Sequence, residues 1–193
     1  MIPKFVLNVP NTLTLLRLLA IPVLAAVIYA GDQYNTLALI LFLAIWVTDL
    51  LDGWIARRFN QMTEFGKLFD LLVDKLFQFT TALMLYIVGK LPFWVPAFIF
   101  VRELLMIIGS AILLRHGKIV VQSKWYGKLS TVLFVAAFAV FFVLPADQRY
   151  LGKYIFLVPI IWSIFAYFRY YQTAVKPWLL RKLAERKKNE SQR

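Results

Sequence analysis

Cysteine is absent from the 193-residue sequence, and histidine occurs once, as His116. Without cysteine the chain has no thiol nucleophile, no thiolate metal site and no Cys-x-x-Cys redox pair. A single histidine excludes a metal site built from several histidines of one chain. Acidic residues are also few, 10 against 22 Lys and Arg, which gives a net charge of +12. We interpret this excess as a signal for membrane orientation and anionic lipid, and we expect no nucleic-acid partner because no nucleic-acid-binding motif is present.

Hydrophobic residues, in contrast, make up 61% of the sequence. Soluble domains are typically about 45–50% apolar, so this chain carries more apolar surface than one small core can hide. A helix needs about 20 mainly apolar residues to cross a bilayer. The sequence therefore predicts an all-α membrane protein with six transmembrane helices. The predicted spans are Leu13–Ala30, Thr36–Trp54, Phe69–Val88, Pro92–Leu114, Leu129–Leu144 and Tyr154–Tyr171.

The connections and ends on the two sides of these spans differ in positive charge. One side contains only Lys90, Arg149 and Lys153. The other side is rich in cations and is expected to be cytoplasmic, which with an even number of spans places both termini in the cytoplasm. Its cations are Lys4, Arg57, Arg58, Lys67, Arg115, Lys118, Lys124, Lys128 and those from Lys176 onward.

The chain divides into a membrane domain, residues 1–175, and a basic cytoplasmic tail, residues 176–193. In the tail, apolar residues stand beside cations, a pattern typical of a segment that lies on an anionic leaflet. A plain solvated tail is the alternative. The first ten residues lack the pattern of a signal peptide, so we expect no cleaved leader.

Four of the ten acidic residues lie in one window, as Asp49, Asp52, Asp70 and Asp74. Carboxylates in or near a membrane span are costly and indicate a functional site. Residues three or four positions apart share a helix face, so each aspartate pair lies on one face. The short connection between the two helices makes them antiparallel neighbours. The sequence therefore predicts one four-carboxylate site at the cytoplasmic ends of the second and third spans.

Four like charges need a counter-charge. Hard divalent cations such as Mg²⁺ or Mn²⁺ prefer oxygen ligands, and two of them about 4 Å apart would clamp a transferring phosphoryl group. The alternative is a set of interfacial salt bridges between the aspartates and nearby cations. Those cations are Arg57, Arg58, Lys67 and Lys75.

The same window contains small residues and an arginine that suit a phosphate ligand. Gly53 and Ala56 would let a flat ligand or a diphosphate approach the backbone, although small residues also pack helices together. Arg57 is a planar fork of donors for a diphosphate. Thr63 and Gly66 would shape the connection over a nucleotide, or serve only as loop and cap residues.

The window resembles the signature of the CDP-alcohol phosphotransferase family. It reads Asp49-x₂-Asp52-Gly53-x₂-Ala56-Arg57-x₈-Gly66-x₃-Asp70-x₃-Asp74, with all eight fixed positions filled over 26 residues. The resemblance implies displacement of CMP from a CDP-linked group by an alcohol, in a six-span homodimer with a polar active-site cavity on the cytoplasmic side. The four aspartates would bind two divalent ions, Mg²⁺ or Mn²⁺, and Asp74 would also be the general base. Gly53, Ala56, Arg57, Thr63 and Gly66 would surround the CDP group.

Two further elements resemble those of one branch of the family, the bacterial phosphatidylglycerophosphate synthases. Asn11, Thr14 and Arg17 open the first span at intervals of three and would contact CDP-diacylglycerol; a helix cap plus a snorkelling arginine is the alternative. Arg102 lies inside the predicted fourth span, where an arginine is costly unless it is paired or faces a wet cavity. Arg102, Lys124 and Lys128 are the candidates for the phosphate of the acceptor, whereas a structural ion pair and positive-inside charge are the alternatives.

The branch resemblance predicts an enzyme of phospholipid biosynthesis in the bacterial cell membrane. It would join CDP-diacylglycerol to sn-glycerol 3-phosphate, giving phosphatidylglycerophosphate and CMP. Two rivals within the family use inositol phosphate or phosphatidylglycerol as acceptor. A divalent-cation transporter is the rival outside the enzyme class, although Arg57 beside the carboxylates does not suit an ion path.

Overall fold

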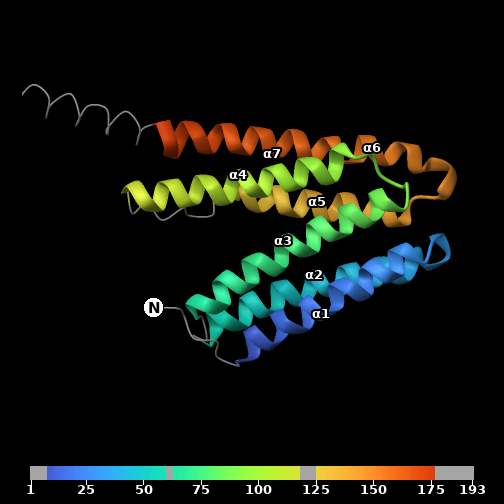
Figure 1. Cartoon of the computed structure of the whole chain (residues 1–193), viewed down its shortest axis with the longest axis horizontal. Helices are drawn as coiled ribbons and strands as arrows, with labels where there is room; N and C mark the ends of the chain where they lie inside the picture. The colour runs from blue at the N-terminus through green and yellow to red at the C-terminus, as the bar shows by residue number, and fades with distance from the viewer. Residues whose placement is uncertain (1–7, 60–62, 118–124, 177–193) are drawn as a thin grey trace, which may run out of the picture. The chain divides into compact units, whose positions relative to one another are not determined.

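The computed structural model describes residues 8–59, 63–117 and 125–176, and every regular element in these ranges is helical (Figure 1). This confirms the predicted all-α class. The elements are α1 (Val9–Tyr29), η1 (Asp32–Tyr34), α2 (Asn35–Arg58), α3 (Glu64–Ile87), α4 (Trp94–Gly117), α5 (Trp125–Val143), η2 (Ala146–Leu151), α6 (Gly152–Ile155), α7 (Leu157–Tyr170) and η3 (Tyr171–Val175).

Within the described ranges, four stretches are long and apolar enough to cross a membrane, as expected for a multi-pass membrane protein. They are Val9–Tyr29, Asp32–Ala56, Trp125–Val143 and Gly152–Thr173. The helix α3 is also long, at 24 residues, but Asp70, Asp74 and Lys75 lie in its first half. The helix α4 has the same length and contains Arg102 and Glu103.

Several helices extend beyond the spans that hydropathy predicts. The helix α2 continues to Arg58, and α3 begins at Glu64, five residues before the predicted start of its span. Polar residues continue a helix without adding to its apolar character, so hydropathy underestimates its length. The predicted last span also differs, because α6 ends at Ile155 and α7 begins at Leu157. Pro159 explains this break, since it has no N–H to bond the carbonyl of Ile155.

The chain forms two compact units. The first unit comprises residues 1–121 and 138–153, and the second comprises residues 122–137 and 154–193. In the first unit, α1 packs against both α2 and α3, and α3 packs against α4 (Figure 1). In the second unit, the buried hydroxyls of Ser130 and Ser163 share a hydrogen bond, and the Trp162 indole N–H donates to the carbonyl of Tyr126 at 3.0 Å.

Aromatic side chains form much of the core of the first unit. The ring of Phe42 on α2 is fully buried and stacks on Phe77 of α3, with ring centroids 4.9 Å apart. Phe138 and Phe142, from the last part of α5, lie against the same ring at 5.5 and 5.8 Å. Such contacts add stability beyond area burial alone. They hold α2 and α3 together, and Phe77 lies on α3 one turn after Asp74.

Two side-chain caps define where α1 and α3 begin. The side-chain oxygen of Asn8 accepts a hydrogen bond from the backbone N–H of Asn11 at 3.0 Å. The hydroxyl of Thr63 accepts one from the backbone N–H of Gly66 at 2.9 Å. Each cap satisfies a backbone donor that the first helical turn leaves without a partner. The caps therefore fix the turns that carry Asn11 and Gly66.

Candidate active site

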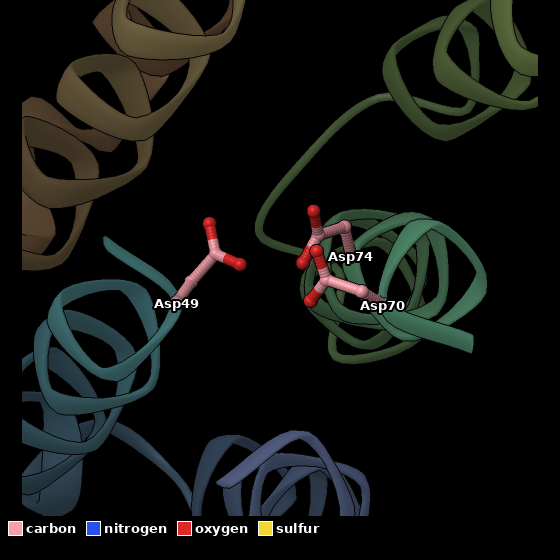
Figure 2. A group of neighbouring side chains, drawn as sticks. All are labelled: Asp49, Asp70 and Asp74. Carbon is pink, nitrogen blue, oxygen red and sulfur yellow. The ribbon is translucent and has the colours of Figure 1, made fainter. Parts of the chain in front are cut away.

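The structure brings the four aspartates of the sequence motif together. Asp49 and Asp52 lie in the second half of α2, and Asp70 and Asp74 lie in the first half of α3. Figure 2 shows Asp49 facing Asp70 and Asp74 from the opposite helix. One carboxylate oxygen from each of these three residues lies within 4.8 Å of the other two. The i, i+3 and i, i+4 spacings thus place both pairs on facing sides of their helices.

An arginine of α1 lies at the centre of this group. The guanidinium of Arg17 forms ion pairs with all four aspartates. Its Nη1 donates to Asp49 and Asp74, each at 2.5 Å. Its Nη2 donates to Asp52 and, at 2.6 Å, to Asp70. Each terminal nitrogen therefore bridges one aspartate of α2 and one of α3.

This arrangement differs from the salt bridges considered as an alternative. Among the described side chains, the partner of the aspartates is Arg17 of α1, which the sequence placed among the contacts to CDP-diacylglycerol; the side chains of Arg57 and Lys67 lie outside the described part. Lys75, one of the cations of that alternative, forms an ion pair with Glu103 of α4 instead.

The four carboxylates differ in exposure. The Asp52 side chain is 3% exposed, whereas those of Asp49, Asp70 and Asp74 are 27%, 37% and 36% exposed. The Thr14 hydroxyl lies 3.4 Å from an Asp52 oxygen and 3.1 Å from the carbonyl of Pro10. A hydroxyl donates only one hydrogen, so Thr14 shares it between these two acceptors. Asp52 is thus fixed against α1, and the other three carboxylates are accessible to a ligand.

The carboxylate set fits a hard divalent cation. Mg²⁺ takes oxygen ligands at about 2.1 Å, so ligands on opposite sides of the ion lie about 4.2 Å apart. The oxygens of Asp49, Asp70 and Asp74 already lie within 4.8 Å of one another, so changes in side-chain torsion would let the three residues share one ion. Three accessible carboxylates and one buried carboxylate therefore supply donors of the right chemistry.

Gly66 is buried at the start of α3 because α1 approaches it closely. A Cβ atom at this position would overlap the side-chain oxygen of Asn11 and would lie 2.8 Å from the hydroxyl of Thr63. Asn11 is itself buried. These three predicted CDP-contact residues are therefore grouped where α1 meets the first turn of α3.

Replacing Gly66 by alanine is expected to destabilise the protein by about 1–3 kcal/mol, the usual cost of overpacking. The added methyl group must displace the side chain of Asn11 or that of Thr63, which caps α3. Gly127→Ala is the matched control, because a Cβ there meets no atom within 4 Å. Thermal denaturation of both purified variants measures the difference. Equal melting temperatures for Gly66→Ala and the wild type would show that the α1–α3 contact is loose.

Arg102 lies in a second buried polar group, formed by α3 and α4. Its Nε donates to Glu103 at 2.8 Å, and its Nη2 donates to Gln78 of α3 at 3.0 Å. The second oxygen of Glu103 pairs with Lys75. Arg102 is only 6% exposed, so the structure supports the alternative of a paired arginine. One carboxylate, however, faces two cations.

The remaining predicted site residues differ in their exposure and in how far the structure describes them. Gly53 and Ala56 are partly buried on α2, and the backbone of Arg57 belongs to the same helix, although its side chain lies outside the described part. Lys128 is exposed on α5, in the second unit. Lys124 lies outside the described residues. Arg102 belongs to the first unit, and the acceptor-phosphate role of these three residues stays a prediction.

Comparison with known families identifies the motif independently. The sequence model described as CDP-alcohol phosphatidyltransferase matches residues 7–172. This range contains all of α1 to α7, and it includes all four aspartates and Arg17. The match confirms the family that the aspartate motif predicts.

Individual relatives carry related names. A protein of Mycobacterium tuberculosis described as a probable phosphatidylglycerophosphate synthase is 37% identical over 72% of this chain and 66% of its own length. A CDP-diacylglycerol–glycerol-3-phosphate 3-phosphatidyltransferase of Aquifex aeolicus is 36% identical over 67% of this chain and 72% of its own length. A CMP-forming cardiolipin synthase of Streptomyces coelicolor is 34% identical over 69% of this chain and 64% of its own length. The matches thus span just under two thirds of the mycobacterial and Streptomyces proteins.

Proposed function

The chain belongs to the CDP-alcohol phosphatidyltransferase family, and from this membership we propose that it is a phosphatidylglycerophosphate synthase. It would transfer the phosphatidyl group of CDP-diacylglycerol to sn-glycerol 3-phosphate and release CMP. The observation that carries this proposal is the convergence of the four motif aspartates into one site. The names of the Mycobacterium and Aquifex relatives support the acceptor.

The reaction is a displacement at the β-phosphate of CDP-diacylglycerol. Asp74, which is partly exposed, would take the proton of the glycerol 3-phosphate hydroxyl as it attacks, and CMP would leave with the electrons of the broken P–O bond. Asp49, Asp52, Asp70 and Asp74 would hold two Mg²⁺ or Mn²⁺ ions, which supply charge neutralisation at the diphosphate when bound. Asp52 would anchor the set, because it is buried against Thr14.

The CDP group would lie over the ends of α1, α2 and α3. Arg57 and Arg17 would bind the diphosphate, and the short side chains of Gly53 and Ala56 would admit it to the α2 backbone. Asn11, Thr14, Thr63 and Gly66 would complete this pocket. Their grouping around Gly66 and Asp52 supports a common surface.

The membrane arrangement follows from the charge pattern. We propose six spans, with α3 and α4 joining the four stretches that are long and apolar enough to cross a membrane, and both termini and the active site at the cytoplasmic face of the bacterial cell membrane. Residues 1–175 would form this domain as a homodimer, and the basic tail 176–193 would follow it. The acyl chains of the substrate would extend between helices into the lipid.

The acceptor phosphate would bind near Arg102, with Lys124 and Lys128 contributing. Arg102 and Lys75 both pair with Glu103, so two cations gather at one carboxylate, an arrangement that suits an anionic ligand. Positive-inside bias explains cytoplasmic lysines, but it does not explain a buried arginine.

Arg102→Gln is expected to raise the KM for glycerol 3-phosphate about tenfold, the effect of one lost charged hydrogen bond. The KM for CDP-diacylglycerol should change little. Glu103 keeps its ion pair with Lys75 in this variant, so the fold is expected to persist, and thermal denaturation checks this. Arg169→Gln, at an exposed position of α7, is the matched control. An unchanged KM for glycerol 3-phosphate in a stable Arg102→Gln protein would make Arg102 a structural residue.

A second acceptor has specific support. The Streptomyces relative is named a cardiolipin synthase, and such an enzyme would use phosphatidylglycerol in place of glycerol 3-phosphate. Measuring CMP release with glycerol 3-phosphate, phosphatidylglycerol and inositol phosphate in parallel separates the candidates. Glycerol 3-phosphate is expected to support the highest rate. A higher rate with phosphatidylglycerol or inositol phosphate would assign that acceptor to the protein. The family membership favours all three transfer reactions over transport of a cation.

A further inference from the structure

Arg17 lies at the centre of the four aspartates, and its terminal nitrogens contact all of them. Its two terminal nitrogens carry four N–H donors, and the four ion pairs use one aspartate for each donor. The guanidinium is 2% exposed. Its remaining donor, Nε, is buried and has no hydrogen-bond partner among the described residues. Among the described residues, the guanidinium therefore forms hydrogen bonds through its two terminal nitrogens and not through Nε.

The position of Arg17 coincides with the place where a shared cation must lie. Nη1 is 2.5 Å from an oxygen of Asp49 and 2.5 Å from an oxygen of Asp74, so it lies between these two carboxylates. An ion ligated by both residues would be about 2.1 Å from its oxygens and would also lie between them. Nη2 is placed in the same way between Asp52 and Asp70. A guanidinium and a metal ion cannot occupy this space together.

The charges of the aspartates and of Arg17 also favour replacement of the guanidinium by metal ions. Four ionised carboxylates carry four negative charges, and Arg17 supplies one positive charge. A single guanidinium leaves most of the repulsion uncompensated, whereas two divalent ions would compensate it fully. The group is therefore held together by Arg17 but is not neutralised by it, which keeps it open to stronger cations.

We propose that Arg17 is an internal counter-cation that competes with divalent metal for the four aspartates and withdraws from them when metal binds. This inference rests on the proposed function, because it concerns metal loading of the same site. Once withdrawn, the guanidinium is a free planar fork that suits the diphosphate of the lipid donor. Metal entry would then prepare both the carboxylates and Arg17 for the substrate.

Direct titration of the purified protein with Mn²⁺ in detergent, without any lipid substrate, tests this competition. Free Mn²⁺ is followed by its electron paramagnetic resonance signal. Arg17→Gln is expected to bind Mn²⁺ about tenfold more tightly than the wild type, which corresponds to about 1.4 kcal/mol, the scale of one lost charged hydrogen bond. Without metal, the same variant should melt at a lower temperature than the wild type, and Mn²⁺ should raise its melting temperature by more.

Two further variants separate competition from a general effect of charge. Arg58→Gln removes a positive charge from an exposed position at the end of α2 and should bind Mn²⁺ like the wild type. Arg17→Lys keeps the charge, but an ammonium has only three donors and cannot hold four carboxylates at once. It should therefore also bind Mn²⁺ more tightly than the wild type. It serves as the test if Arg17→Gln does not fold.

The opposite results would overturn the proposal. Mn²⁺ affinity that is unchanged or weaker in the Arg17 variants would show that Arg17 stays in place or helps to bind the metal. Equal tightening in Arg17→Gln and Arg58→Gln, with none in Arg17→Lys, would show a through-space charge effect only. Failure of the proposed function gives a different result, namely Mn²⁺ binding by the wild type without release of CMP from CDP-diacylglycerol and glycerol 3-phosphate.

Discussion

Replacing Asp74 by asparagine is expected to lower the rate of CMP release by about 10²–10⁴-fold, the usual contribution of a general base. Asparagine keeps the size and much of the hydrogen bonding of aspartate but cannot accept a proton at neutral pH. Asp74 is one of the three accessible carboxylates of the group, which allows it to reach an acceptor hydroxyl. The measurement is single-turnover CMP release with saturating substrates and metal.

The fold of this variant is expected to persist. Four carboxylates share one guanidinium, so removal of one negative charge relieves repulsion among the other three. The melting temperature should therefore stay the same or rise. Asp147→Asn, at an exposed position of η2, is the control and should retain full activity. Near-normal turnover by Asp74→Asn would assign the base to another residue.

Removal of divalent metal is expected to abolish turnover completely. Without metal, the aspartates remain paired with Arg17 and offer no positive charge to the diphosphate of CDP-diacylglycerol, which carries negative charge itself. Activity is measured in excess chelator and again after Mg²⁺ or Mn²⁺ is added beyond the chelator concentration. Addition of either ion should restore the rate, because both prefer oxygen ligands.

Loss of activity in chelator should not reflect unfolding. Arg17 keeps α1, α2 and α3 joined at the site, so the metal-free protein is expected to melt cooperatively. Full turnover in chelator, with no metal detected in the protein, would contradict the role of the aspartates as metal ligands.

Local spacing was sufficient to predict the aspartate group. Asp49 and Asp52 share one face of α2, and Asp70 and Asp74 share one face of α3, because their spacings match the helical repeat. A short connection then brings the two faces together. These relations lie within one window of sequence, and the structure brings together the carboxylates that they specify.

The place of Arg17 could not be predicted in the same way. Its spacing from Asn11 and Thr14 indicates a common region of α1, but it does not specify which distant residues α1 will face. The contacts of Arg17 span 32 to 57 positions in the sequence, so they depend on how α1 packs against α2 and α3. The close approach of Asn11 to Gly66 depends on the same packing.

The partners of Arg102 could be predicted only in part from the sequence. Glu103 is its neighbour in the sequence, and the pair was recognisable on that basis. Lys75 and Gln78 are three positions apart on α3 and therefore share a face, a signal that points to a polar partner on another helix. Only the packing of α3 against α4 shows that this partner is the Arg102–Glu103 pair.

The central claim is that one site, built on the four aspartates, transfers the phosphatidyl group to glycerol 3-phosphate. The most direct test incubates the purified protein with CDP-diacylglycerol, radiolabelled glycerol 3-phosphate and Mn²⁺, and measures CMP and labelled lipid in the same samples. We expect equal amounts of both products from the wild type and at least about 100-fold less of each from Asp74→Asn in the same time. CMP release without label in the lipid, or equal product formation by Asp74→Asn, would contradict the claim.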